Sequence, residues 1–467
     1  MIVFDRDIMA VLSKAGCNQG ACHGNFNGKG GLKLSLRGEN PAADYATLSR
    51  DQFGRRANAL DPDASLLLAK PTLAVAHEGG RRFDRESPEY AILRDWIAAG
   101  MPPSPSDRPA LEALEVAPRD VVLVEPHDSV SLSAEAVFAD GTRRDVRRLA
   151  CYDPSSPVAA VSLDGVVRRQ QFGDATILVR YLGKQASVRV SFVPARSDYV
   201  WRPQPARTQF DLDVFAQLQT LRQNPAPLAA DATFVRRAFL DLLGIIPTAD
   251  EARAFIADQT PDKRARLIDA LLARPEFADR FALKWADLLR GEEKQLDERG
   301  VAVFHTWIRR SIAEGKPLDQ FVRELVTADG STYQNPPANF YRALRNPIAR
   351  GEAAAQVFLG TRLQCAKCHN HPFERWTQDD YYRWAAVFAR IDYKIIENKR
   401  RDDLDKHEFN GEQQVLFVDK GAVEYPNTDR SAQPKFLGGG NLGGAMNDAD
   451  GRARAAALAD WLTRDDN

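Results

Sequence analysis

Two cysteines and a histidine stand in a spacing that suits one particular covalent chemistry. Cys365, Cys368 and His369 form a Cys-x-x-Cys-His pattern. Two thiols about one helical turn apart can add across the two vinyl groups of a haem, and the adjoining imidazole then lies under the iron as its proximal ligand. The pattern therefore predicts a covalently attached haem c, with the thioethers fixing the ring and His369 fixing the iron.

The same residues are compatible with two other kinds of site. Thiolates and imidazoles are the ligands that Zn²⁺ prefers, so this motif and the nearby His371 could hold a structural metal. Four ligands in so short a run would be crowded, because structural zinc sites usually take two pairs from separate segments. A redox-active dithiol is the third interpretation, but such pairs normally follow a strand of a βαβ unit, and the residues before Cys365 have helical periodicity. We favour haem and keep both alternatives open.

A wider version of the motif lies near the N-terminus. Cys17 and Cys22 are separated by four residues, and His23 follows directly. A loop between the thiols can bulge to absorb the extra residues, so we expect these three side chains to attach another haem. The alternative is a pair of small buried cysteines beside a histidine in a turn. Four glycines follow and would let a flat ring approach the backbone without meeting a Cβ atom: Gly24, Gly28, Gly30 and Gly31.

Two residues compete to bind the second face of the first iron. His77 lies in the loop before the last expected helix of this segment, where a distal ligand commonly originates, and Met101 follows that helix. We expect His77 to be the ligand, with a solvated loop histidine as the alternative.

The second iron has no evident distal ligand. His371 is too close to His369 to reach the opposite face unless the chain folds back sharply. His305 and His407 are candidates, and an open or water-ligated iron also fits the sequence.

Composition excludes several classes of partner. The chain has 467 residues, of which 44% are hydrophobic and 27% charged, and its net charge is −1. These values are ordinary for globular domains and give no basic field that would attract nucleic acid or an acidic membrane. The sequence has no run of eighteen apolar residues, which is about the length needed for a helix to span a membrane.

The N-terminal residues lack the features of a secretory signal peptide. Thioether bonds to haem are generally made outside the cytoplasm, so we expect a signal or anchor segment that was removed or lies upstream. The expected location is the periplasm or the cell surface.

Residues 1–108 have the element order of a small c-type cytochrome. An apolar helical pattern ends at Gly16, immediately before the wide motif. A second helix is expected to begin at Ser87 and Pro88. Its apolar face consists of Tyr90, Leu93, Trp96 and Ile97.

Residues 113–195 change from helical to alternating periodicity. The apolar residues from Val130 to Phe138 share one face of a predicted strand, and Asp140-Gly141 predicts a hairpin turn. About seven short strands separated by turns predict an immunoglobulin-like β-sandwich. A spacer or an adhesion module is its default role.

Residues 209–395 are again helical. Thr248 and Glu251 form a capping box, and a helix from about Arg350 to Leu363 leads into the motif at Cys365. Four residues are expected to face the interior of a helix bundle: Leu267, Ile268, Leu271 and Leu272. Residues 396–467 are predicted to be a strand and loop segment, followed by the start of a further helical domain that the chain does not complete. The predicted fold class is therefore multidomain and mainly α, with an inserted all-β domain.

Four stretches together resemble the planctomycete-type cytochrome family. They are Gly16-Cys-Asn-Gln-Gly-Ala-Cys-His-Gly24, His77-Glu-Gly-Gly-Arg-Arg-Phe83, the alternating segment, and Cys365-Ala-Lys-Cys-His-Asn-His-Pro-Phe373. That family joins a cytochrome-c-like domain, a group 2 bacterial Ig-like domain and a large helical domain of unknown function with its own Cys-x-x-Cys-His motif. The resemblance covers nearly the whole chain. The resemblance implies haem attachment at both motifs and export of the protein. It does not imply a particular activity.

The leading functional hypothesis is an exported multidomain cytochrome with two haems that relays electrons to a redox partner protein. The Ig-like segment would be a spacer or a contact to the cell surface or to carbohydrate. No nucleophile elbow, phosphate loop, zinc helix or dinucleotide fingerprint occurs, which favours electron transfer over enzymatic turnover. The alternatives are a cell-surface scaffold with structural metal at the Cys/His sites, and a haem enzyme with an open iron at the second site.

Overall fold

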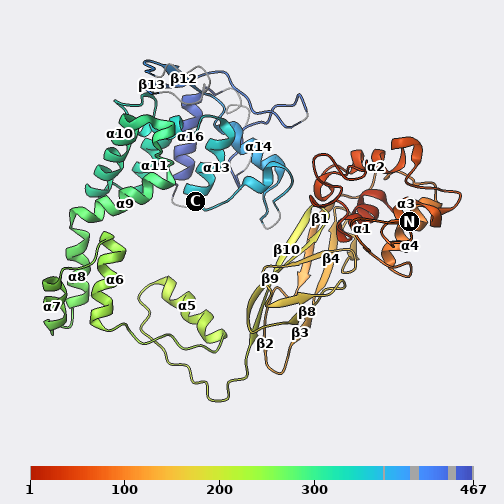
Figure 1. The fold of residues 1–467 in the computed structure, drawn as a ribbon, viewed down its shortest axis with the longest axis horizontal. Coiled ribbons are helices and arrows are strands. Elements are labelled where there is room, and N and C mark those ends of the chain that lie inside the picture. The colour runs from red at the N-terminus through yellow and green to blue at the C-terminus, as the bar shows by residue number, and fades with distance from the viewer. Residues whose placement is uncertain (1, 372–373, 400–409, 427, 440–448, 465–467) are drawn as a thin grey trace. The chain divides into compact units, whose positions relative to one another are not determined.

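The chain folds as two units that combine helical and β parts. The computed structural model describes residues 2–371, 374–399, 410–426, 428–439 and 449–464. One unit comprises residues 1–226 with 368–375, and the other comprises residues 227–367 with 376–467. In each unit the first elements along the chain are helices, and strands come later (Figure 1). The protein is therefore multidomain, with both helical and β parts. No helix in the described ranges is long and apolar enough to cross a membrane.

Short helices form the N-terminal part of the first unit. A π-helical turn, Phe4–Ile8, runs directly into the first α-helix. Ser87 caps the last helix, because its Oγ accepts a hydrogen bond from the Tyr90 backbone nitrogen at 3.2 Å and Pro88 occupies the first helical position. The predicted apolar face of this helix is confirmed, since all four of its residues are buried. The helices are α1 (Met9–Lys14), α2 (Pro41–Ser49), α3 (Leu66–Ala69) and α4 (Pro88–Ala98).

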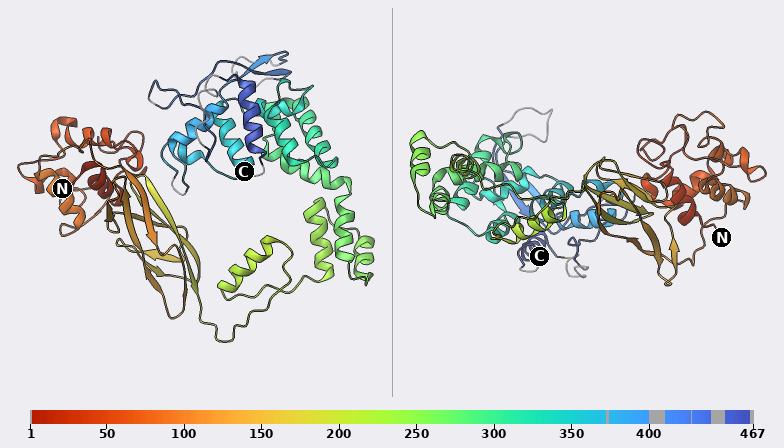
Figure 2. Two further views of the ribbon diagram at one scale, coloured as in Figure 1. Left: turned by 180° about the vertical axis from the view of Figure 1, so that it is seen from behind. Right: turned by 90° about the horizontal axis from the view of Figure 1, so that it is seen from below.

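Ten strands follow between residues 111 and 193. They form three sheets, in the orders β1-β4-β5, β2-β10-β9-β6 and β3-β8-β7. The β2-β10 pair is parallel and the other pairs are antiparallel. Figure 2 shows these strands running alongside one another from two further sides. The strands are β1 (Leu111–Ala117), β2 (Asp120–Val124), β3 (Ser129–Ser131), β4 (Ser133–Phe138), β5 (Arg143–Asp145), β6 (Cys151–Pro154), β7 (Ala159–Val161), β8 (Val166–Arg169), β9 (Gly173–Tyr181) and β10 (Lys184–Val193).

The predicted strand from Val130 to Phe138 is divided. Its alternation is present, because Leu132, Ala134, Ala136 and Phe138 are all buried. However, β3 pairs with β8 whereas β4 pairs with β1 and β5, so the chain changes sheet at Leu132. The predicted hairpin at Asp140-Gly141 is confirmed by the antiparallel β4-β5 pair.

The helical and β parts of the first unit share one hydrophobic core. Buried residues of α1 and α4 belong to the same cluster as those of β1, β4, β9 and β10. Polar contacts cross the same boundary: Lys14 Nζ donates to the Ala150 carbonyl at 2.7 Å, and the Tyr181 hydroxyl donates to the Arg6 carbonyl at 3.1 Å. The β segment therefore packs against the helical part directly and supports it.

The described residues of the second unit form a helical assembly with one small sheet. The Thr248 and Glu251 capping box is confirmed at the start of α7. The sheet has the antiparallel order β11-β13-β12. The helices are α6 (Asp231–Leu243), α7 (Ala249–Ala257), α8 (Lys263–Leu272), α9 (Pro275–Leu288), α10 (Glu293–Ala313), α11 (Leu318–Val326), α12 (Asn339–Ala343), α13 (Pro347–Phe358), α14 (Gln378–Val387) and α16 (Gly451–Leu462). The strands are β11 (Gly330–Ser331), β12 (Ile391–Ile395) and β13 (Gln413–Phe417), and α5 (Gln209–Thr220) belongs to the first unit.

Two expectations for the helical region need correction. The helix expected at Arg350–Leu363 is α13, which begins at Pro347 and ends at Phe358. The Asn346 side chain caps it by accepting from the Ala349 backbone nitrogen at 2.8 Å, and Gly360 follows its end with φ 62°. Of the four α8 residues expected inside, Ile268 and Leu272 are 38% and 43% exposed.

A buried arginine holds the core of the second unit. Arg350 is 1% exposed and donates to the carbonyls of Leu344 at 2.8 Å and Phe388 at 2.9 Å, and to the Tyr393 hydroxyl at 2.7 Å. These acceptors are neutral, and together they satisfy a charge that would otherwise be costly to bury. Arg350 thereby joins α13 to the end of α14 and to β12.

Asp7 provides the stability prediction for the first unit. Its side chain is 3% exposed, accepts from the Val3 backbone nitrogen at 2.7 Å and pairs with Arg144 of β5. We expect Asp7→Ala to lower the free energy of unfolding by about 2 kcal/mol, because a buried backbone donor and a cation lose their acceptor. The matched control is Asp84→Ala, whose ion pair with Arg81 is 65% and 60% exposed, and it should cost less than about 0.5 kcal/mol. Urea unfolding of the full chain measures both; equal effects would contradict the role given to Asp7.

Candidate functional site

A cavity in the first unit brings the wide N-terminal motif together with a residue far along the sequence. Its volume is about 390 Å³, which is within the range of small-molecule and cofactor sites. Cys17, Cys22 and His23 line it, and His77 lines it from the loop between α3 and α4. Much of the remaining lining is apolar: Leu12, Leu32, Leu34, Leu48, Leu66, Leu67, Phe83 and Leu93.

The two extra residues of the wide motif are absorbed in a tight loop. The His23 backbone nitrogen donates to the Cys17 carbonyl at 3.0 Å, and the Gly24 nitrogen donates to the Gln19 carbonyl at 3.0 Å. A Cβ atom on Gly24 would lie 2.1 Å from the Asn18 carbonyl oxygen, so this position requires glycine. The loop therefore keeps both half-buried thiols and the imidazole at the same cavity.

The rings of His23 and His77 lie near each other and are nearly parallel. Their centroids are 6.3 Å apart and their planes differ by 12°. A metal atom bound by two imidazoles lies about 2 Å from each nitrogen, which places the two ring centroids about 6 Å apart. The separation therefore fits one metal atom between the two rings.

Backbone carbonyls fix the tautomer of both histidines. His23 Nδ1 lies 3.1 Å from the Lys29 carbonyl and 3.2 Å from the Leu32 carbonyl, and His77 Nδ1 lies 2.9 Å from the Gly80 carbonyl. A carbonyl oxygen can only accept, so Nδ1 carries the proton in each ring. Nε2 then keeps its lone pair, which is the arrangement of metal-binding histidines whose other nitrogen donates to the protein.

Burial shifts the pKa values of His23 and Cys17 toward their neutral forms. It lowers the pKa of His23, so the imidazole remains unprotonated to lower pH than usual. Burial also raises the pKa of Cys17 to about 11, so this thiol is protonated near neutral pH. The cavity thus offers two imidazoles and two cysteines, with Cys17 held as the thiol, among largely apolar side chains, and this set fits a covalently attached haem.

Met101 lies away from this cavity. Its backbone nitrogen donates to the Trp96 carbonyl at 3.0 Å, and its carbonyl accepts from the Tyr45 hydroxyl at 3.0 Å. Its side chain packs against the shared core of the first unit and is not part of the cavity lining. The structure thus brings His77, and not Met101, to His23.

The second motif spans the division between the two units, which falls between Lys367 and Cys368. Cys365 is exposed in a 3₁₀ turn, Gln364–Lys367, whose Lys367 carbonyl accepts from the Tyr382 hydroxyl at 3.0 Å. Cys368 is exposed, and His369 Nδ1 lies 2.6 Å from the Asn370 carbonyl.

The candidates for a distal ligand at the second motif differ in their exposure to solvent. His371 is 7% exposed and therefore buried. His305 is half-buried on α10. Pro372, Phe373 and His407 lie outside the described residues.

The zinc alternative gains no support from the described part of the chain. Within it, no group of three or more His, Cys, Asp or Glu side chains is arranged to hold a metal ion. A haem iron takes at most two protein ligands, so this finding does not bear on haem.

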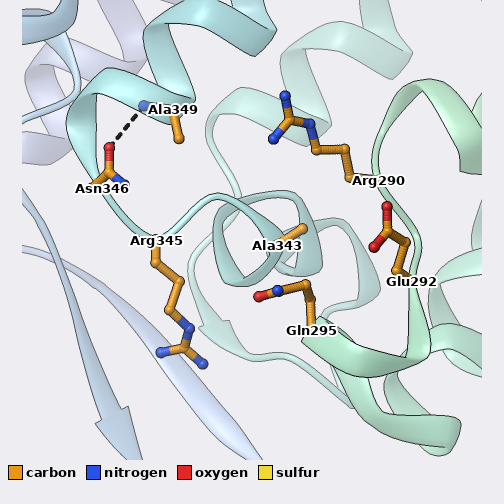
Figure 3. A pocket seen from close by; sticks show the side chains of 7 residues that line it. All are labelled: Arg290, Glu292, Gln295, Ala343, Arg345, Asn346 and Ala349. Atoms are coloured by element: carbon orange, nitrogen blue, oxygen red, sulfur yellow. Dashed lines mark hydrogen bonds between the residues drawn. The ribbon is translucent and has the colours of Figure 1, made fainter. Parts of the chain in front are cut away.

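A polar cavity of about 280 Å³ lies in the second unit (Figure 3). It is lined by Arg290, Glu292, Gln295, Ala343, Arg345, Asn346 and Ala349. Figure 3 shows the Asn346 side chain bonded to the Ala349 nitrogen at the start of α13. Neither a thiol nor an imidazole lines this cavity, so it does not have the donors for haem attachment.

One part of the chain matches a known family. Residues 209–393 match PSCyt2, a planctomycete-type family described as a protein of unknown function (DUF1549). The match covers less than half of the chain and includes the second motif. No curated protein matches the chain at a significant level.

Sequence analysis missed the basic residues around the first cavity. Arg55 and Lys70 line it from two different segments, and neither lies in a motif. Only the fold brings them to the cavity that the two histidines line, so no spacing in the sequence could have indicated them.

The geometry predicts different consequences for the two proposed distal ligands. In haem-loaded protein, His77→Ala should convert the first iron from low spin to high spin, because the sixth position loses its imidazole. Met101→Ala is the control and should leave the low-spin spectrum unchanged. Absorption spectra of the ferric protein measure both, and a change with Met101→Ala alone would overturn the assignment.

Proposed function

We propose that the protein is an exported c-type cytochrome that relays electrons through two covalently attached haems. The observation that supports this most strongly is the cavity in which two thiols and two facing imidazoles meet. Haem, when bound, supplies one-electron chemistry. The second haem would be attached at Cys365, Cys368 and His369, within the region that matches PSCyt2.

Each residue of the first site has a distinct role in this proposal. The sulfur atoms of Cys17 and Cys22 would each bond one carbon of a vinyl group while the thiol proton would go to the other carbon, so attachment would need no oxidant. His23 and His77 would hold the iron through their Nε2 atoms. The leucines and Phe83 exclude water, which lowers the local dielectric constant and so tunes the reduction potential.

Electron relay is the function that best fits the first site. Two imidazoles would occupy both axial positions, so no open position would remain for a substrate. Transfer of electrons requires only a fixed haem of suitable potential and an edge that a redox partner can approach. The planctomycete-type cytochrome resemblance supports the location outside the cytoplasm. An Ig-like β segment between the haem regions would serve as support or as a surface contact.

The number of haems per chain tests the proposal directly. Protein made together with the haem c maturation machinery should contain two haems that acid and organic solvent do not extract. Cys17→Ala with Cys22→Ala should remove one equivalent, and Cys365→Ala with Cys368→Ala should remove the other. A pyridine haemochrome assay measures the count. Zinc without haem absorbance after maturation would refute the proposal.

Carbon monoxide distinguishes a relay from a haem enzyme at the first site. The Cys365→Ala, Cys368→Ala variant retains only this site, and after reduction its Soret band should not respond to carbon monoxide, because both axial positions are filled. The His77→Ala form of the same variant is the positive control and should form an adduct. A stoichiometric adduct without the His77 change, together with peroxide turnover, would indicate an enzyme instead.

A further inference from the structure

The first cavity has a basic side as well as an apolar one. Four cationic residues line it, whereas Glu78 is its one acidic residue. Two of the four already have partners: Lys29 pairs with Glu78 at 3.7 Å, and the buried Arg56 donates to the carbonyls of Thr47 at 2.9 Å and Gly31 at 2.5 Å. The other two are Arg55 and Lys70, both exposed at the cavity.

A strained turn places Arg55 at this position. Gln52, Phe53 and Gly54 are consecutive and have φ values of 53°, 58° and 69°. Left-handed backbone is strained for a non-glycine residue, and it persists where the surroundings enforce it, often at ligand clamps. Burial of Phe53 does not offset this strain, because the ring is fully exposed at 106%.

Hydrogen bonds from the buried Arg56 stabilise the turn. Its guanidinium donates to the carbonyl of Thr47 on α2, to that of Gly31 in the glycine loop and, at 3.4 Å, to that of Asp51 at the start of the turn. The neighbouring Gln52 and Arg55 both line the cavity. Within the described ranges no ion pair engages Arg55, and the nearest acceptor of Lys70 Nζ is the Ala76 carbonyl at 3.5 Å.

We propose that Arg55, assisted by Lys70, binds the carboxylates of the group held between His23 and His77, and that the turn at residues 51–54 exists to present Arg55. This inference rests on the proposed function, because haem carries two carboxylates on its ring. The apolar lining cannot solvate them, and a guanidinium is the side chain best suited to a carboxylate. The site therefore recognises a dicarboxylate porphyrin and discriminates against a neutral one.

Reversible binding tests this recognition. Cys17→Ala with Cys22→Ala prevents covalent attachment and leaves both imidazoles in place. The full chain with these changes is titrated with ferric haem and with ferric haem dimethyl ester, whose carboxylates are neutralised. The ratio of the two dissociation constants is compared between variants, so that differences in the solubility of the two compounds cancel. The expected preference for the free acid is about tenfold with Arg55 present.

The variants separate the effect of the positive charge at residue 55 from any effect of the substitution on folding. Arg55→Gln should abolish the preference, and Arg55→Lys should keep part of it. Arg81→Gln is the matched control, because Arg81 is exposed, pairs with Asp84 and does not line the cavity; it should keep the full ratio. Circular dichroism confirms that each variant is folded.

The outcomes distinguish the two proposals. Low-spin binding of both compounds with a ratio that Arg55→Gln does not change would refute the carboxylate assignment and leave the haem site intact. Failure of the folded protein to bind either compound would refute both proposals. Loss of the ratio in Arg55→Gln alone supports the assignment.

Discussion

The hydrogen bonds that hold the two imidazoles are the constraint on which the first site depends. His23 donates from Nδ1 to the carbonyls of Lys29 and Leu32, and His77 does so to the carbonyl of Gly80. Each bond fixes a tautomer and a ring orientation before any metal arrives, so the two lone pairs are available without rearrangement. Preorganisation of this kind reduces the entropy lost on binding. Without these bonds the cavity would be an apolar pocket with two unoriented histidines.

The β segment stabilises the helices that carry this arrangement. Leu12 on α1 lines the cavity, and α1 continues directly from the π-helical turn at residues 4–8. That turn is held from both sides: the Phe4 ring packs against Trp96 at a centroid distance of 5.3 Å, and Asp7 pairs with Arg144 of β5. A helical segment of about one hundred residues buries little core by itself, so a shared core adds stability. The proposed spacer is thus also a structural support.

Local features were predictable and long-range ones were not. The cap at Ser87, the capping box at Thr248 and the hairpin at Asp140 depend on neighbouring residues, and all three are confirmed. The change of sheet at Leu132 depends on pairing with distant strands, which alternation alone cannot specify. The exposure of Ile268 depends on how α8 packs, which helical periodicity does not define on its own. At the site, residue types identified the thiols and His77, but the left-handed turn beside Arg55 carries no motif.

The angle between the imidazole planes offers the most direct test of the central claim, that His23 and His77 hold one haem iron between them. Planes only 12° apart should give the ferric low-spin iron a rhombic electron paramagnetic resonance spectrum with three resolved g values, because parallel axial ligands lift the degeneracy of the iron d orbitals. The measurement uses haem-loaded protein with Cys365→Ala and Cys368→Ala, so that the first site alone contributes. This rhombic signal is the expected result if both imidazoles bind the iron. A high-spin signal, or a strongly anisotropic one typical of perpendicular ligand planes, would contradict it.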